Sequence, residues 1–188
     1  MSPHSKTQSH ASINTPNLPR SPGATVGLDR LDPKLRLIKN LTDNAEYKRA
    51  LDVLSKNTTD PEELNCRGVC LLRMHEFVQA ISPLRMVALN TRTLRLHEHI
   101  ADHIKINYSI ALFFGGEPSG GLDTLAEAKP SESDPSVLML RRQAKRWAEG
   151  MNIFRRIDWY LNRIAPPIGP VPPSEPVGQF LWDLQSFH

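Results

Sequence analysis

The sequence has no long run of apolar residues, and only two of its 188 residues are cysteine. No apolar stretch approaches the roughly 20 residues that a helix needs to cross a membrane. The N-terminus also has no apolar core of the kind found in signal peptides. These absences predict a cytoplasmic location and no membrane partner.

Sequence signatures of catalysis are absent as well. There is no glycine-rich phosphate loop, no nucleophile elbow and no carboxylate pair at a suitable spacing. The two cysteines, Cys66 and Cys70, are four residues apart on one expected helix, so their side chains run parallel and do not converge to a disulfide. We expect both thiols to be reduced and buried, whereas a cysteine nucleophile needs an accessible, electropositive setting. The sequence therefore predicts a protein that is not an enzyme and holds no cofactor.

Patterns typical of β-strands are weak, but signals for the start of a helix recur. Aspartate is followed by proline at residues 32–33, 60–61 and 134–135. Aspartate is a good N-cap, and proline is preferred in the first turn because that turn does not use its N–H group. No alternation of apolar and polar residues has comparable strength. The predicted fold class is all-α.

Two stretches have the pattern of a helical hairpin. In the later one, residues 107–128, apolar residues recur at helical spacing on both sides of a turn marked by Gly115, Gly116 and Pro118. An earlier stretch repeats the pattern around a turn at residues 74–76. When the two stretches are superposed, Gly68 aligns with Ser109, Leu71 with Leu112, Ala80 with Gly121, Leu84 with Leu125 and Val87 with Ala128.

This pattern resembles the tetratricopeptide repeat, a helical hairpin of about 34 residues in which small residues let two helices pack closely. The resemblance implies a right-handed superhelical stack of hairpins with a C-terminal capping helix. The first hairpin departs from the pattern by having Ile38 where a small residue is expected, and the 41 residues between Gly68 and Ser109 imply an extension around residues 91–101. The expected hairpins span residues 31–57, 60–90 and 99–129, and capping helices span 135–164.

The two ends of the chain differ from this helical domain, which is expected to span residues 28–164. Residues 1–27 have few large apolar side chains, and we expect them to be disordered. Residues 165–188 begin as a proline-rich spacer and end in an apolar segment. If that segment, residues 178–188, is helical, then Phe180, Leu184 and Phe187 share one face. It either folds back on the protein or docks on a partner, and its exchange between two copies would give a homodimer.

A curved stack of hairpins offers a concave groove, so the resemblance implies a scaffold or chaperone-like adaptor that binds a protein or peptide. Val69 stands where the carboxylate-binding branch of the family has a clamp asparagine, so we expect an apolar helix or an extended peptide as the ligand. Every side chain predicted to line this groove is also compatible with ordinary interhelical packing. The predicted groove residues are Asn65, Val69 and Leu72 in the second hairpin, and His103, Ile106, Asn107, Ile110 and Phe113 in the third.

Two alternatives remain open at this point. The pI of about 9.0 and a row of basic side chains on the capping helices are compatible with nucleic-acid binding, although the formal net charge is only +3. His99 and His103 have the spacing of a helical metal-binding pair, but the sequence identifies no third ligand. The basic residues are Arg141, Arg142, Lys145, Arg146, Arg155 and Arg156.

Overall fold

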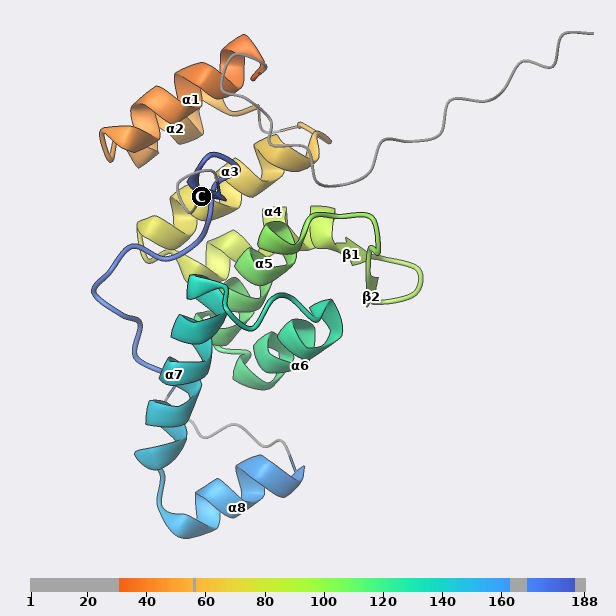
Figure 1. Ribbon diagram of the computed structural model, residues 1–188, viewed down its shortest axis with the longest axis vertical. Coiled ribbons are helices and arrows are strands. Elements are labelled where there is room, and N and C mark those ends of the chain that lie inside the picture. Colours follow the sequence, from red (N-terminus) through yellow and green to blue (C-terminus); the bar gives the residue numbers. More distant parts are fainter. Residues whose placement is uncertain (1–30, 56, 163–168, 185–188) are drawn as a thin grey trace, which may run out of the picture.

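The computed structural model describes residues 31–55, 57–162 and 169–184, apart from the side chain of Tyr160. The expected disordered tail, residues 1–27, and Phe187 lie outside these described residues. Helices dominate the described chain, which confirms the all-α class (Figure 1). The helices are α1 (Pro33–Asp43), α2 (Tyr47–Val53), α3 (Pro61–Arg73), α4 (Phe77–Ala88), α5 (Asp102–Phe114), α6 (Pro118–Ala128), α7 (Pro135–Glu149) and α8 (Ile153–Asn162), and the strands are β1 (Leu89–Asn90) and β2 (Arg95–Leu96).

The three aspartate–proline pairs begin helices, as predicted. Asp32 accepts a hydrogen bond from the backbone N–H of Lys34 at 2.8 Å, and Asp60 accepts one from Glu63 at 2.9 Å. Asp134 accepts from the backbone N–H of Ser136 at 2.8 Å. Each carboxylate thereby satisfies an N–H group that the first turn leaves without a helical partner.

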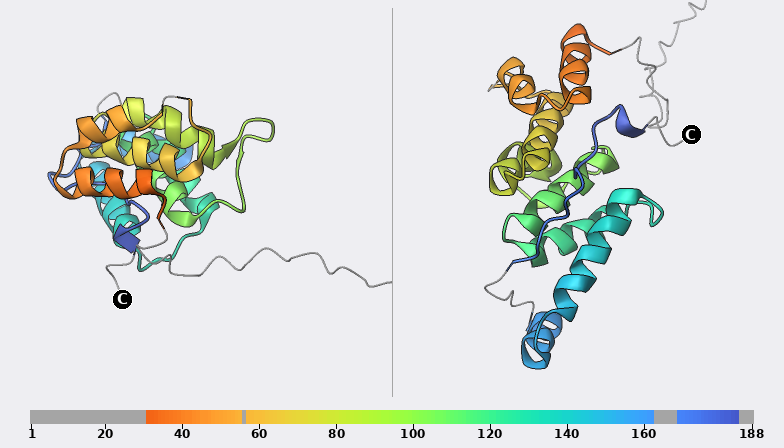
Figure 2. Two further views of the ribbon diagram at one scale, coloured as in Figure 1. Left: turned by 90° about the horizontal axis from the view of Figure 1, so that it is seen from above. Right: turned by 90° about the vertical axis from the view of Figure 1, so that its left-hand side faces the viewer.

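Helices that follow one another in the sequence also pack on one another. From α1 to α6 each helix contacts the next one in the sequence. Helix α3 also touches α5, and α7 covers part of α5. The result is an elongated molecule with α1 and α2 at one end and α8 at the other (Figures 1 and 2).

Small residues set the distance between paired helices. A Cβ atom added to Gly121 of α6 would lie 2.8 Å from both the backbone nitrogen of Phe113 and the carbonyl oxygen of Ser109. A Cβ atom added to Gly68 of α3 would overlap the side chain of Leu84. The expected small positions therefore lie where α6 crosses α5 and where α4 crosses α3.

We expect Gly121→Ala to lower the free energy of unfolding by about 1–3 kcal/mol, because the backbone of α5 has to move away from the added methyl group. The matched control is Gly120→Ala, whose added Cβ would have no neighbour nearer than 3.7 Å. Alanine is the better helix former, so the control is expected to gain about 0.5–1 kcal/mol. Urea unfolding followed by circular dichroism measures both changes. Equal effects of the two substitutions would contradict a close crossing at Gly121.

The extension around residues 91–101 is a β-hairpin followed by a short loop. Leu89 pairs with Leu96, and Asn90 pairs with Arg95. The side chain of Asn90 accepts hydrogen bonds from the backbone N–H groups of residues 92 and 93, at 2.9 and 3.2 Å, which shapes the turn. Helix α5 consequently begins at Asp102, later than the sequence pattern indicated.

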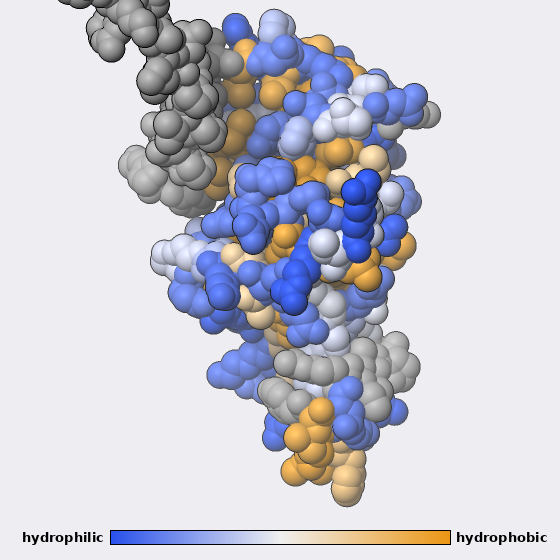
Figure 3. Space-filling view, turned by 90° about the vertical axis from the view of Figure 1, so that its right-hand side faces the viewer, coloured by the Kyte–Doolittle hydropathy of each residue, from blue (hydrophilic) through white to orange (hydrophobic). Residues whose placement is uncertain are grey.

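Helices α7 and α8 are separate, and the break between them changes which side of α8 is buried. Asn152 starts α8 by accepting a hydrogen bond from the N–H of Arg155 at 2.9 Å. Because the chain turns here, Trp159 is the α8 residue that packs on Trp147, with ring centroids 4.9 Å apart. Phe154 and Ile157 are apolar but lie on the other side of α8, where they are 78% and 48% exposed. Figure 3 shows apolar residues gathered at this end of the molecule.

A candidate peptide-binding groove

The C-terminal segment, residues 177–184, returns to the helical domain and lies across α3 and α5 (Figures 1 and 2). Val177, Gly178, Gln179, Phe180 and Trp182 are all buried there. Of the two fates expected for this apolar segment, the structure shows the first, folding back. Residues 176–180 are not helical and the chain turns after Phe180, so within the described residues Phe180 and Leu184 do not share the face of a regular helix.

Two buried asparagines hold the main chain of this segment. The side-chain amide of Asn107 accepts a hydrogen bond from the backbone N–H of Gln179 at 2.8 Å and donates one to the carbonyl oxygen of the same residue at 2.8 Å. It also donates to the side-chain oxygen of Asn65 at 2.8 Å, and Asn65 donates to the Gln179 carbonyl at 3.4 Å. Both asparagine side chains are fully buried. They bind backbone groups that every residue except proline possesses, so this contact holds an extended chain without selecting a side chain.

Glycine is required at the preceding position. Gly178 has a φ of +90°, which disfavours other residues, and an added Cβ would lie 3.0 Å from Leu72 and 3.2 Å from Val69. The backbone of the segment thus approaches α3 more closely than a side chain would allow.

Two stacked aromatic rings follow the glycine. Phe180 and Trp182 have ring centroids 4.8 Å apart and planes inclined by 14°. Both rings belong to a hydrophobic cluster that joins α3 to the first two helices. The other buried members of this cluster are Leu31, Ile38, Leu41, Ala50, Leu54, Cys66, Val69 and Cys70. The C-terminal segment therefore completes the packing between α1, α2 and α3.

Arg73 fixes the turn that follows. Its guanidinium donates hydrogen bonds to the carbonyl oxygen of Gly178 at 3.1 Å and to the carboxylate of Asp183 at 2.8 Å. It also lies 4.9 Å from the ring centroid of Phe180. Asp183 in turn accepts from the backbone N–H of Phe180 at 3.0 Å. One arginine therefore joins the backbone, the aromatic ring and the acidic side chain of the segment.

The sequence interpretation missed both Arg73 and Asp134. Arg73 lies four residues after Val69, one turn further along the same face of α3, so extending the groove pattern by one turn would have found it. The carboxylate of Asp134 accepts two hydrogen bonds from the side chain of Gln179, at 3.1 and 3.2 Å, in addition to capping α7. Nothing in the sequence signals this second role.

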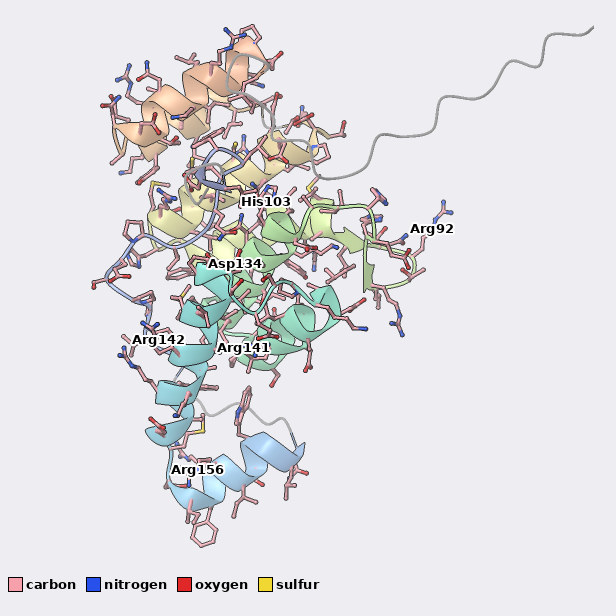
Figure 4. All side chains as sticks on the ribbon, in the orientation of Figure 1. Arg92, His103, Asp134, Arg141, Arg142 and Arg156 are labelled. Carbon is pink, nitrogen blue, oxygen red and sulfur yellow. The ribbon has the colours of Figure 1, made fainter. Side chains whose placement is uncertain are left out.

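All eight predicted groove residues are buried. Asn65 and Asn107 bind the segment, and Val69 and Leu72 lie beneath Gly178. The others lie in the same region but with different neighbours. Ile106, Ile110 and Phe113 belong to the core cluster that also contains Val177, and His103 lies beside Glu62 with 3.6 Å between its Nε2 atom and a carboxylate oxygen (Figure 4).

The cysteines lie under the same segment and are not activated. Both Cys66 and Cys70 are free and buried. Burial raises the pKa of Cys66 well above its ordinary value, and neighbouring carboxylates such as Glu62 raise it further. Burial raises the pKa of Cys70 to about 12, despite the opposing effect of Arg73. Neither thiol is therefore poised to act as a thiolate nucleophile.

The residues of the two alternative sites are arranged differently. His99 precedes α5, so the prediction that it shares a helix with His103 is wrong, and in the described part of the chain no three His, Cys, Asp or Glu side chains gather to hold a metal. Among the basic residues, Arg141 pairs with Glu132. A pocket between α7, α8 and residues 169–175 is lined by Arg142, Arg146 and Arg155. Figure 4 labels Arg142 on α7 and Arg156 on α8.

None of the described helices combines the length and the apolar character needed to cross a bilayer. No family model, curated protein or solved structure with significant similarity to this chain is found. The geometry of the groove is therefore the basis on which a function can be inferred.

Proposed function

We propose that this chain is a non-enzymatic scaffold of the tetratricopeptide type, which binds an extended peptide in the groove formed by α3 and α5. The hairpins α1–α2, α3–α4 and α5–α6 are its repeat units, stacked as a right-handed superhelix and capped by α7 and α8. One observation carries the proposal: Asn65 and Asn107 together hold the backbone of an extended segment that crosses these two helices.

Three features of the contact support a ligand site. The amide of Asn107 meets both backbone groups of one residue, which is how a side chain holds a peptide without reading its sequence. The bound segment reaches the groove from α8 through residues 163–176, so it is joined to the helical domain as a tethered peptide. Selective contacts flank the asparagine pair, because Gly178 and Phe180 are held by shape and by Arg73.

Binding of a synthetic peptide tests the proposal. The probe is a fluorescent peptide of residues 175–184, EPVGQFLWDL. The receptor is the full chain with its own segment released by Gly178→Val, Phe180→Ala and Trp182→Ala, which leave every groove residue unchanged. We expect binding in the micromolar range by fluorescence anisotropy, and loss of binding when Asn107→Ala is added. A released receptor that keeps its helical circular dichroism but binds no peptide at millimolar concentration would contradict the proposal.

The pocket beside α7 supports nucleic-acid binding as a second candidate function. Within the described residues, Arg142, Arg146 and Arg155 line this pocket and make no ion pair. Three free guanidinium groups beside Trp147 could follow a phosphate backbone. This candidate predicts binding of single-stranded oligonucleotides that weakens steeply with salt and is lost when the three arginines are changed to alanine. Retained binding in that triple variant would exclude the pocket.

A further inference from the structure

We propose that the groove selects a partner protein through a short extended segment with the pattern glycine, any residue, aromatic, any residue, aromatic, acidic. The chain's own residues 178–183, GQFLWD, fit this pattern and occupy the groove until a partner segment displaces them. This inference rests on the proposed function and specifies its ligand.

The glycine of the pattern follows from space and backbone conformation. Any ligand whose backbone reaches Asn107 passes over Leu72 and Val69. A Cβ atom added at the position of Gly178 would lie 3.0 Å from the side chain of Leu72 and 3.2 Å from that of Val69. The positive φ at Gly178 adds a second penalty for every other residue. A ligand without glycine here cannot form the backbone contact at its full strength.

The pattern includes two aromatic residues because a segment that leaves the groove exposes the apolar side chains on which its own two rings were packed. Phe180 and Trp182 cover Cys70 and the rest of the cluster between α1, α2 and α3. If they leave and nothing replaces them, the apolar surface of this cluster that packs on the two rings faces water. A displacing ligand therefore has to bring rings of its own, and the planar stack of 4.8 Å fits two aromatic side chains separated by one residue.

The acidic residue follows from Arg73. Its guanidinium is mostly buried, with 18% of the side chain exposed, and Asp183 is its ion-pair partner at 2.8 Å. A ligand with a neutral residue at this position would leave a largely buried cation without a counter-charge. The same carboxylate receives the backbone N–H of Phe180, which holds the turn of the segment.

Buried polar atoms that the resident segment leaves unused indicate that exchange is possible. Within the described residues, the Nε atom of Arg73 is buried and has no hydrogen-bond partner. The Oε2 atom of Glu62 and the Nε2 atom of His103 have none either. Glu62 and His103 lie one turn before Asn65 and Asn107 on the same two helices, so they extend the line of polar side chains along the groove. A partner segment that satisfies some of these atoms gains hydrogen bonds that the resident segment does not make.

Covalent attachment protects the resident segment from weak competitors. Because the segment belongs to the same chain as its groove, its binding is intramolecular, with an effective concentration on the order of millimolar. A peptide that binds an empty groove with micromolar affinity is therefore expected to bind the closed wild-type chain roughly 100-fold or more weakly. The resident segment can therefore be displaced only by a partner that matches the pattern or is present at a high local concentration.

Selection from a random peptide library tests the pattern. The bait is the released full chain, carrying Gly178→Val, Phe180→Ala and Trp182→Ala, and the counter-bait carries Asn107→Ala in addition. We expect peptides retained by the bait and lost by the counter-bait to share glycine, aromatic, aromatic and acidic residues at the spacing of GQFLWD. Groove-dependent peptides with an unrelated pattern would overturn this inference but leave the proposed function standing. The absence of any groove-dependent peptide would overturn both.

A second measurement on the wild-type chain guards against a bait that fails to fold. A peptide of residues 175–184 with a photoreactive residue at the position of Leu181 is added in millimolar excess, and its crosslinks are mapped. We expect crosslinks to α3 that disappear when the peptide carries the change equivalent to Gly178→Val. Crosslinks elsewhere, or an equal yield with the altered peptide, would overturn the inference. A stable dimer that exchanges C-terminal segments would also overturn it, since the occupant would then be a second copy of this chain.

Discussion

Phe180→Ala is expected to lower the free energy of unfolding by about 3–5 kcal/mol, although Phe180 lies outside every helix. Its ring is only 1% exposed and stacks on Trp182 within the cluster that joins α1 and α2 to α3. Removing it leaves a cavity among these helices and frees the guanidinium of Arg73 from its aromatic contact. Urea unfolding followed by circular dichroism measures the loss.

The chain supplies a matched control for this experiment. Phe154 is the same residue type on α8, but it is 78% exposed. Phe154→Ala is expected to change the free energy of unfolding by no more than about 0.5 kcal/mol. If the two alanine substitutions had equal effects, Phe180 would not be part of the folded core and the C-terminal segment would not occupy the groove.

Asn107→Leu is expected to have the second-largest effect, a loss of about 3 kcal/mol or more in the free energy of unfolding. Leucine is close to asparagine in size but makes no hydrogen bonds, so the side-chain oxygen of Asn65 and the backbone N–H of Gln179 lose their partner. The carbonyl oxygen of Gln179 keeps only the longer bond from Asn65, at 3.4 Å. A buried polar group without a partner costs about 1–3 kcal/mol. The backbone amide of Gln179 should at the same time exchange its hydrogen rapidly with solvent.

Asn40→Leu is the control for this prediction. Asn40 is exposed on α1, where its side chain meets only that of Asn44, at 3.1 Å. Leucine is the better helix former, so this variant is expected to be as stable as the wild type. Continued protection of the Gln179 amide in Asn107→Leu would show that another group holds the segment.

Local chemistry made much of the helical domain predictable from the sequence. The three aspartate–proline pairs marked the starts of α1, α3 and α7, because capping depends only on neighbouring residues. Gly68 and Gly121 marked the close helix crossings, because only a residue without a side chain fits there. Asn65 and Asn107 were expected in the groove because the resemblance to the tetratricopeptide repeat implies a concave face lined by the first helix of each hairpin.

The features that were missed depend on longer-range geometry. A β-hairpin shaped by Asn90 delayed the start of α5, which removed His99 from the helix of His103. A turn capped by Asn152 separates α7 from α8, so the orientation of α8 and the exposure of Phe154 do not follow from the spacing of apolar residues alone. The groove pattern, extended by one turn, reaches Arg73, but the partner of Arg73 lies more than a hundred residues away in the sequence and no local pattern reveals it.

Hydrogen exchange at the backbone amide of Gln179 is the most direct test of the claim that the groove is a peptide site with a tethered occupant. The measurement uses isotope-labelled full chain and a rising concentration of unlabelled peptide 175–184. Because the Gln179 amide donates to Asn107, we expect it to be protected in the free chain and to lose protection as the peptide fills the groove. A peptide with the change equivalent to Gly178→Val should have no effect. Protection that persists at millimolar peptide, or an amide unprotected from the start, would contradict the account.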